Sequence, residues 1–179
     1  SMVTLARFNP IQVLDIIDKH NVNLFLTVPS VYRALLRVPA DNKSIRKIRL
    51  AVSGGEALPK DVAEGFLKQF GLNIYEGYGL TETSPVITLN TKANTQPGTV
   101  GKPLNGVTVK TADDGEILVK GPNIMKGYYR KEELTNQIIT ADGWFRTGDL
   151  GAIDKDGFVS ITGRKKELII SAGENILPS

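Results

Sequence analysis

The stretch from Tyr75 to Pro85, YEGYGLTETSP, holds the side chains in this sequence that are best suited to chemistry. Tyr78 offers an aromatic face, Thr81 a hydroxyl and Glu82 a carboxylate, and Gly79 adds a hinge-like glycine among them. Such groups can stack on a base, bond a phosphate oxygen and hold Mg²⁺, because a hard cation prefers oxygen ligands and shares them with phosphates. The stretch fits neither helical nor strand periodicity well, and the alternative to a binding site is a polar loop with a buried tyrosine.

The segment SGGEAL, Ser53–Leu58, stands between an expected strand and an expected helix. Open α/β sheets place their ligands at this kind of position. Gly54 and Gly55 would let the backbone approach a ligand closely. For the segment taken alone, a tight turn that needs glycine is the simpler explanation.

Two further segments contribute charged groups. In GWFRTGDLG, the carboxylate of Asp149 can accept hydrogen bonds from two neighbouring sugar hydroxyls, although an aspartate after glycine is also a common turn residue. In TGRKKELIISAGEN, the planar guanidinium of Arg164 suits phosphate or ribose oxygens. Lys165 and Lys166 are also consistent with a solvated entry into a strand.

Helices and strands alternate from Asn9 to about Phe70. Asn9 and Pro10 form a good N-cap and first-turn pair. The segments NLFLTV and IRLAVSGG predict short strands, whereas PSVYRALLR and PKDVAEGFLKQF predict helices, the second with Val62, Phe66 and Phe70 in an apolar stripe. This alternation predicts a mostly parallel sheet covered by helices.

Beyond about Pro97 the pattern changes to antiparallel β structure. Two pairs of extended runs are joined through Asp114-Gly115 and Asp156-Gly157, which are strong hairpin signals, and KEELTNQIIT between them predicts one short helix. We therefore predict an α/β part followed by antiparallel β, that is, a helix-covered sheet layer plus a distorted β-barrel-like subdomain. The predicted boundaries are 1–96 for the α/β part, 97–163 for the β subdomain and 164–179 for the start of a further unit.

Composition excludes several classes of site. No apolar run in the 179 residues approaches the roughly 18 that a membrane span needs. The net charge of +3 is a mild excess spread along most of the chain, so it does not favour a nucleic-acid partner. Without cysteine and with only His20, the sequence offers no disulfide framework, thiol nucleophile or histidine cluster for zinc. His20 lies outside every motif, and we expect it to be structural or on the surface. The lack of cysteine and of a targeting signal favours a cytoplasmic location.

The segments discussed above stand in the order found in the adenylate-forming superfamily of acyl-CoA synthetases, peptide-synthetase adenylation domains and luciferases, which this chain resembles from about Val22 to its end. The resemblance is carried by SGGEAL, YGLTET, GEILVKGPNIMKGYY, GWFRTGDLG and GRKKELIISAGENI. Within the superfamily, GYGLTETSPV is most similar to fatty acyl-CoA synthetases. The resemblance implies the C-terminal half of the large N-terminal domain of such an enzyme, followed by the hinge and the start of a C-terminal domain.

The same resemblance implies roles for the residues of the first stretch. Tyr78, next to Gly79, would stack on adenine, Thr81 would contact the α-phosphate, and Glu82 would hold the Mg²⁺ that is bound to ATP. Lys166 would occupy the hinge about which the C-terminal domain rotates between adenylation and thioester formation. Thr81, Glu82 and Lys166 are thus the implied catalytic residues.

The remaining implied contacts come from the other motifs. Asp149 would take the ribose hydroxyls with the assistance of Arg164. Gly54, Gly55 and Glu56 would line the pocket for adenine and the acyl carboxylate. Gly173 would belong to a loop of the C-terminal domain that meets the pantetheine tunnel.

The implied activity is the ATP-dependent conversion of a carboxylic acid, here a fatty acid, into acyl-AMP with release of pyrophosphate, followed by transfer of the acyl group to CoA. ATP, Mg²⁺ and CoA as co-substrate are the implied small-molecule partners. The attacking carboxylate is already ionised at neutral pH, which accounts for the absence of a histidine or cysteine base from the motifs. Catalysis can then depend on positioning and on neutralising phosphate charge.

Two features of the family are missing from the sequence: the phosphate-binding loop upstream and the catalytic lysine of the C-terminal domain. We therefore expect a fragment with little or no adenylation activity of its own. We also expect it to self-associate through exposed apolar surface, and the full-length protein to associate peripherally with membranes.

The sequence leaves several functions open. The acyl acceptor could be a carrier protein, but the compact segment between Tyr129 and Trp144 lacks the insertion typical of such ligases and so favours CoA. The chain could also belong to an amino-acid adenylation domain, or form a non-catalytic nucleotide-binding or interaction module. Among substrates, we expect medium or long fatty acids, and aryl acids are the alternative class.

Overall fold

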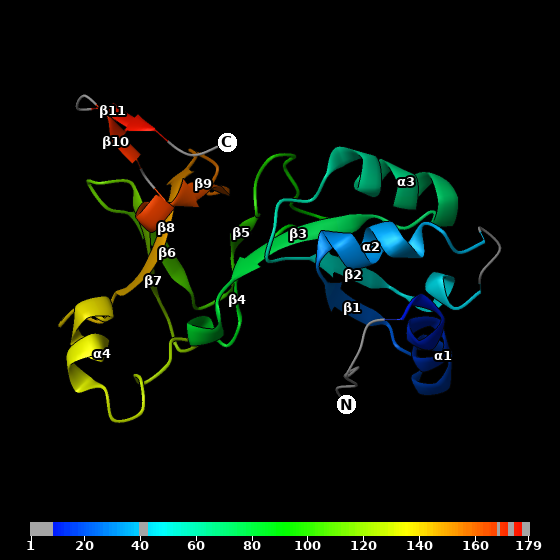
Figure 1. Ribbon diagram of the computed structural model, residues 1–179, viewed down its shortest axis with the longest axis horizontal. Coiled ribbons are helices and arrows are strands. Elements are labelled where there is room, and N and C mark those ends of the chain that lie inside the picture. The colour runs from blue at the N-terminus through cyan, green and yellow to red at the C-terminus, as the bar shows by residue number, and fades with distance from the viewer. Residues whose placement is uncertain (1–8, 40–42, 168, 172–173, 177–179) are drawn as a thin grey trace. The chain divides into compact units, whose positions relative to one another are not determined.

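The computed structural model describes residues 9–39, 43–167, 169–171 and 174–176. The chain divides into two compact units, Ser1–Glu76 and Gly77–Ser179, and each is described by itself. Elements carry the labels of Figure 1. No helix in the described ranges is long and apolar enough to cross a membrane.

The first unit is a parallel three-stranded arrangement with three helices. Strands β1, β2 and β3 pair in that order, and each neighbouring pair is parallel. The elements of this unit are α1 (Pro10–His20), β1 (Leu24–Thr27), α2 (Pro29–Leu35), a short 3-10 helix (Ile45–Lys47), β2 (Leu50–Ser53), α3 (Lys60–Phe70) and the beginning of β3 (Ile74–Gly79). The predicted alternation of helices and strands is therefore confirmed.

Local sequence accounts for the helices of the first unit. Asn9 caps α1 by accepting hydrogen bonds from the backbone N–H groups of Ile11 and Gln12. The predicted stripe of α3 is buried, and the ring of its central residue Phe66 lies edge-on to Tyr32 of α2, with the ring centroids 5.2 Å apart. The Tyr32 hydroxyl lies within hydrogen-bonding distance of the carbonyl oxygens of Phe25 in β1 and Val52 in β2, so α2 is fixed to both strands.

The second unit is antiparallel. The remainder of β3 pairs with β4 (Val86–Leu89), which pairs with β5 (Lys102–Pro103). A four-stranded antiparallel sheet follows in the order β6, β7, β8, β9, with α4 at one end of it in Figure 1. The bounds of its elements are β6 (Thr108–Thr111), β7 (Glu116–Lys120), α4 (Glu132–Ile138), β8 (Phe145–Ile153), β9 (Val159–Arg164), a 3-10 helix (Lys165–Glu167), β10 (Ile169–Ser171) and β11 (Glu174–Ile176).

Both predicted hairpins and the predicted helix α4 are present in the second unit. The turns contain Gly115 and Gly157, each with positive φ, and the sheet is packed around Ile87, Ile117 and Val159. The antiparallel pairing begins earlier than expected, at Gly77, because the second half of β3 pairs with β4 instead of continuing the parallel pattern. The sequence-based domain boundaries at 96/97 and 163/164 stay a prediction.

The expectation that the stretch Tyr75–Pro85 fits no regular element is wrong for its first half. Tyr75–Gly79 belongs to β3, and only the segment from Leu80 onward leaves the strand, through the 3-10 helix Thr81–Thr83. Gly79 is required by a close approach, since a Cβ placed there would clash with the carbonyl oxygen of Pro85. Strand pairing on both sides of β3 overrides its low intrinsic β propensity.

Candidate functional site

Three of the predicted site residues meet in the second unit. The Tyr78 hydroxyl donates to Asp149 Oδ2 at 2.6 Å, and the Arg164 Nε lies 3.4 Å from Asp149 Oδ1. The Asp149 carboxylate is largely buried, whereas the Arg164 side chain is about two-thirds exposed. One carboxylate is thus held between a phenol and a guanidinium that come from separate parts of the sequence.

Strand pairing explains why these side chains converge. Asp149 in β8 and Arg164 in β9 are directly opposite in the antiparallel register, so their side chains share one face of the sheet. The backbone N–H of Asp149 donates to Thr147 Oγ1, and the Thr147 hydroxyl in turn donates to the carbonyl oxygen of Ile117 in β7. The backbone that carries Asp149 is therefore tied to the neighbouring strand.

The Tyr78 phenol is in its protonated, donating form. Burial raises its pKa well above the usual value for tyrosine, and the hydrogen bond to Asp149 raises that pKa further. At neutral pH the hydroxyl therefore donates to the carboxylate at all times, which leaves the other lone pairs of Asp149 as acceptors.

Glu82 lies in the 3-10 helix that follows β3. Its Oε1 accepts a hydrogen bond of 2.8 Å from the Tyr128 hydroxyl, and its backbone carbonyl accepts one of 2.8 Å from the N–H of Met125. The hydrogen bond to Glu82 is also the main cause of a raised pKa of Tyr128. Oε2 of Glu82 makes no hydrogen bond to any described residue. Thr81 is exposed beside it.

The short helix that carries Thr81 and Glu82 is held by its third residue. The buried Thr83 hydroxyl accepts from the N–H of Leu80 and lies 2.7 Å from the carbonyl oxygen of Pro85. The side-chain amide of Asn123 donates to the carbonyl oxygens of Thr83 and Val86. Loop geometry therefore fixes the direction in which the Glu82 carboxylate leaves the backbone.

The side chains of Glu82, Asp149 and Arg164 suit a nucleotide that carries a hard cation. Mg²⁺ is usually held by one or two protein carboxylates together with phosphate oxygens and water, and the free oxygen of Glu82 can serve as such a ligand. Asp149 retains acceptor capacity for hydroxyl groups, and Arg164 brings a mostly exposed cation beside it. Asp149 and Arg164 are thus suited to a sugar, and Glu82 is suited to a cation that binds phosphates.

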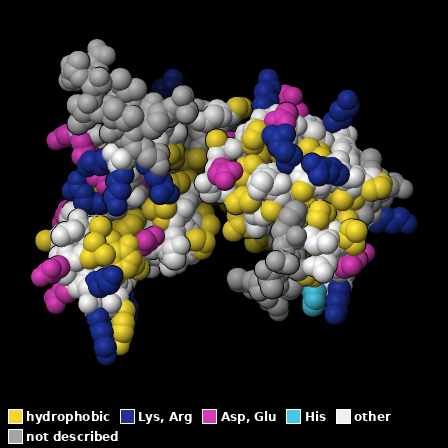
Figure 2. Space-filling view, viewed as in Figure 1, with side chains coloured by type: hydrophobic (Ala, Val, Ile, Leu, Met, Phe, Trp, Pro, Cys, Tyr) yellow, Lys and Arg dark blue, Asp and Glu magenta, His cyan; other side chains and the backbone are white. Residues whose placement is uncertain are grey.

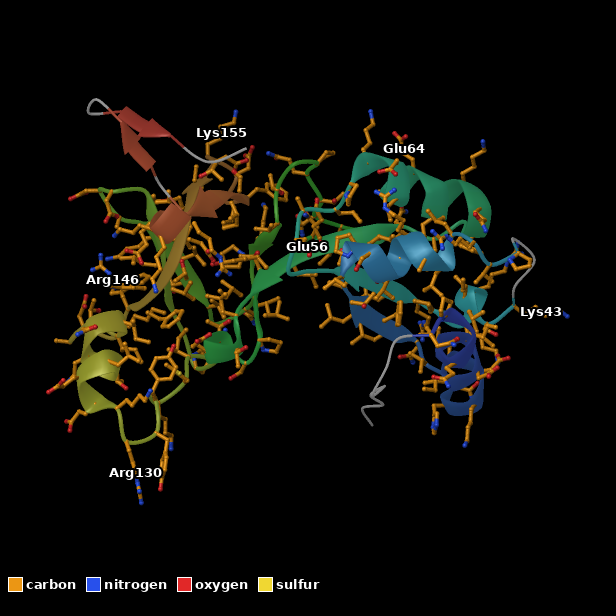
Figure 3. All side chains as sticks on the ribbon, in the orientation of Figure 1. Lys43, Glu56, Glu64, Arg130, Arg146 and Lys155 are labelled. Carbon is orange, nitrogen blue, oxygen red and sulfur yellow. The ribbon has the colours of Figure 1, made fainter. Side chains whose placement is uncertain are left out.

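Gly54, Gly55 and Glu56 belong to the first unit, in the loop after β2, where Figure 3 labels Glu56. The N–H of Gly54 donates to the carbonyl oxygen of Thr27, and Gly55 has a φ of 85°, a left-handed conformation that favours glycine. The end of this loop is held by Glu76, whose carboxylate accepts a hydrogen bond of 2.9 Å from the N–H of Leu58. The turn predicted from SGGEAL is therefore present and anchored at both ends.

The remaining predicted residues are Lys166, Gly173 and His20. Lys166 is exposed and forms no ion pair with the described residues, while Gly173 lies outside the described residues. His20 is exposed at the end of α1, and Figure 2 shows the histidine at the surface of the first unit. It is therefore a surface residue.

Sequence reasoning missed a charged network beside Asp149. Glu116, Arg146 and Lys165 form it together with Asp114, and Glu116 is almost fully buried. One available signal was the position of Glu116 directly before the apolar run Ile117–Val119, where an unpaired carboxylate would be costly. Lys165 is accordingly a paired residue and not simply a solvated entry into a strand.

Comparisons with known proteins agree with this geometry. A family model described as AMP-binding enzyme matches residues 1–129. The long-chain-fatty-acid–CoA ligase of Bacillus subtilis strain 168 is 40% identical over 190 residues, covering 99% of this chain and 34% of that protein. A long-chain-fatty-acid–CoA ligase of Mycobacterium bovis is 48% identical over 150 residues, covering 83% of this chain and 24% of that protein. The chain thus spans about a third or less of the length of these curated relatives.

A comparison with solved structures also finds a coenzyme A synthetase. The O-succinylbenzoate coenzyme A synthetase of Bacillus subtilis, in complex with ATP and magnesium ion, matches with a TM-score of 0.84 and 34% sequence identity. The match covers 96% of this chain and 38% of that chain. The predicted fold class, part of the large domain of an adenylate-forming enzyme, is therefore confirmed.

Proposed function

Because the chain belongs to the AMP-binding enzyme family, we propose that it is part of an ATP-dependent acyl-CoA ligase whose acid substrate is a fatty acid. The observation that carries this proposal is the contact of 2.6 Å between Tyr78 and Asp149. It brings two separate motifs, each with an assigned nucleotide contact, to one place in the second unit.

The roles that the family resemblance implies agree with the chemistry of each side chain. The Asp149 carboxylate would accept hydrogen bonds from the ribose hydroxyls, with the cation of Arg164 beside it, while the ring of Tyr78 would stack on adenine. Thr81 would donate to the α-phosphate. Glu82 would hold Mg²⁺, which supplies neutralisation of phosphate charge.

The proposed reaction needs no general base from this chain. The ionised carboxylate of the acid attacks the α-phosphorus of ATP, an acyl–phosphate bond forms, and pyrophosphate leaves with the electron pair of the broken P–O bond. The sulfur of CoA then attacks the acyl carbon, the thioester forms, the thiol proton passes to solvent, and AMP leaves. Binding and orientation by the residues named above are the contribution of this chain to the first step. Lys166 is the proposed hinge between the two steps, and Gly54, Gly55 and Glu56 the proposed lining of the acyl-carboxylate pocket.

Two observations support CoA and a fatty acid as substrates. The long-chain-fatty-acid–CoA ligases named above are similar over 83% and 99% of this chain. The segment between Tyr129 and Trp144 is also compact. An aryl acid is the competing substrate class, since a feruloyl-CoA synthase of Amycolatopsis is 33% identical over 192 residues.

The test measures pyrophosphate release by the full-length protein with ATP, Mg²⁺ and a panel of fatty and aryl acids. We expect release that depends on the acid and is fastest with medium or long fatty acids, and formation of acyl-CoA when CoA is added. Faster pyrophosphate release with aryl acids would overturn the fatty-acid assignment. Pyrophosphate release that does not depend on an added acid would overturn the assignment as an acyl-CoA ligase.

An assay of the 179-residue chain alone tests the expectation that this fragment has little adenylation activity of its own. We propose that it releases little or no pyrophosphate because the family's phosphate loop and C-terminal lysine are not in its sequence. Rates comparable to those of the full-length protein would contradict this.

A further inference from the structure

We propose that Glu116 is a positioning residue for the ribose site, because its single buried carboxylate holds both strand segments that carry Asp149 and Arg164. This inference rests on the proposed nucleotide-binding function and assigns it a residue that touches no substrate. Glu116 stands in the segment GEILVKGPNIMKGYY, but the resemblance assigns it no role, so its contacts alone support the proposal.

The two oxygens of Glu116 have separate partners. Oε1 accepts a hydrogen bond of 3.0 Å from the backbone N–H of Gly148. Oε2 accepts from Arg146 and from the Lys165 ammonium, each at 3.1 Å. Only 4% of the side chain is exposed, so these bonds form in a region with little competing water.

Two of the partners of Glu116 are adjacent in sequence to residues of the proposed ribose site. Gly148 directly precedes Asp149, and Lys165 directly follows Arg164. Fixing the Gly148 N–H sets where β8 presents the Asp149 carboxylate. Fixing the Lys165 ammonium sets where the end of β9 presents the Arg164 guanidinium.

The charge of Glu116 is needed as well as its shape. Asp114 also contacts Lys165, at 2.6 Å, and lies 4.0 Å from Arg146, so two carboxylates face two cations. The raised pKa of Lys165, caused first by Asp114 and then by Glu116, agrees with a stable ion pair. Figure 3 labels Arg146, which lies on the β6–β9 sheet. A neutral residue at position 116 would leave both cations with one carboxylate.

The experiment compares ATP with 2′-deoxy-ATP in the full-length protein carrying Glu116→Gln. Glutamine keeps the size and one acceptor oxygen but loses the charge. We expect the unmodified protein to show a KM for ATP at least about 10-fold below that for 2′-deoxy-ATP, because 2′-deoxy-ATP lacks one of the hydroxyls that would donate to the charged Asp149 carboxylate. In Glu116→Gln this ratio should fall toward one, with kcat changed by less than about 3-fold, since ribose contacts act equally in ground and transition states.

Two further variants keep the test decisive. Asp113→Asn removes the same charge from the same turn without touching the network, and it should keep the full ratio. Lys165→Gln changes a partner of Glu116 whose side chain is 40% exposed, so we expect this variant to fold. It should lower the ratio of the two KM values part of the way. A melting temperature is measured for each variant.

The outcomes separate the ribose assignment from the role of Glu116. An unmodified protein that does not distinguish the two nucleotides would overturn the ribose assignment and this inference with it. If that protein distinguishes them and both Glu116→Gln and Lys165→Gln do so equally well, the ribose assignment stands and the role of Glu116 is wrong. A KM ratio that falls toward one in Glu116→Gln and part of the way in Lys165→Gln, with the full ratio kept in Asp113→Asn, supports the role of Glu116.

Discussion

The hydrogen bond from the Tyr78 hydroxyl to Asp149 fixes the orientation of the Tyr78 ring relative to the Asp149 carboxylate. We predict that Tyr78→Phe in the full-length protein raises the KM for ATP by about 3- to 10-fold, with kcat nearly unchanged, since the ring remains but the carboxylate loses its donor. Steady-state kinetics with ATP as the varied substrate checks this. A lowered kcat at an unchanged KM would contradict the assigned role.

Glu82 supplies a prediction that depends on the metal. Glu82→Gln removes the charge but leaves an acceptor for the Tyr128 hydroxyl, so the local fold should survive. We expect pyrophosphate release to need about 10-fold or more higher Mg²⁺ to reach half of its maximum, because a charged oxygen ligand is replaced by a weaker neutral one. Tyr128→Phe is the control, since it removes the hydrogen bond to Glu82 and keeps the carboxylate. An equal Mg²⁺ requirement in the unmodified protein and Glu82→Gln would exclude Glu82 as the ligand.

At this scale, the sequence proposes which residues form the site but does not predict all of their contacts. Tyr78, Asp149 and Arg164 stand in recognisable motifs, and the structure brings them together. The bond from Glu116 to Gly148 was not predictable, because it depends on the register of β7 against β8. A one-residue slip in that register would turn Glu116 to the opposite face, and nothing local in the sequence excludes it.

Among the elements, α2 makes the stability of the first unit depend on pH through Tyr32. Burial raises the pKa of this phenol, so the folded chain keeps its proton at pH values where an unfolded tyrosine, titrating near 10.0, has lost it. The unfolded state then binds fewer protons than the native state, and the free energy of unfolding falls as pH rises above about 10 by up to about 1.4 kcal/mol per pH unit. Below about pH 9 this contribution is constant.

Tyr32→Phe checks the sign of this effect. At neutral pH the variant should be less stable by about 1 kcal/mol, because the hydroxyl that reaches Phe25 and Val52 is gone. Above about pH 10 its stability should fall less steeply than that of the unmodified chain. Urea unfolding followed by circular dichroism from pH 7 to pH 11 gives both values, and parallel slopes would contradict the assignment.

Most elements were predictable where periodicity or turn chemistry was strong. The stripe through Val62 and Phe66 predicted α3, and Asp114-Gly115 predicted the β6–β7 hairpin. Strand β5 was not predicted, because Lys102–Pro103 is too short to show a pattern and exists through its pairing with β4. The first half of YEGYGLTETSP was missed for a related reason, since its glycines disfavour a strand in isolation and only β2 and β4 on its two sides stabilise it.

For the molecule as a whole, each unit has its own core. The first is packed around residues such as Ile17, Leu35 and Phe66, and the second around Ile87, Ile117 and Val159. The proposed ribose contacts, the Mg²⁺ ligand and the Glu116 network all lie within the second unit. The geometry argued for them therefore depends only on the packing of that unit.

Among the described residues of the first unit, two leucines of β1 form an exposed apolar strip. Leu24 and Leu26 on the outer face of β1 are 56% and 51% exposed, while Phe25 between them points to the other face and packs in the core. Parallel sheets are normally covered on both faces. Among the described strands of its sheet, β1 also stands at the edge, where unpaired backbone groups can join another strand.

We predict that the 179-residue chain self-associates weakly through this strip. Burying two half-exposed leucines on each of two copies contributes about 4 kcal/mol, which offsets part of the cost of association, and pairing along β1 would add to it. Sedimentation velocity from about 10 μM to 1 mM should show a rising average mass. Leu26→Lys should abolish the rise, since a charge would have to be buried, whereas Leu67→Lys on the exposed side of α3 should not. A constant monomer mass across this range, or an equal effect of both substitutions, would show that the exposed apolar strip does not drive association.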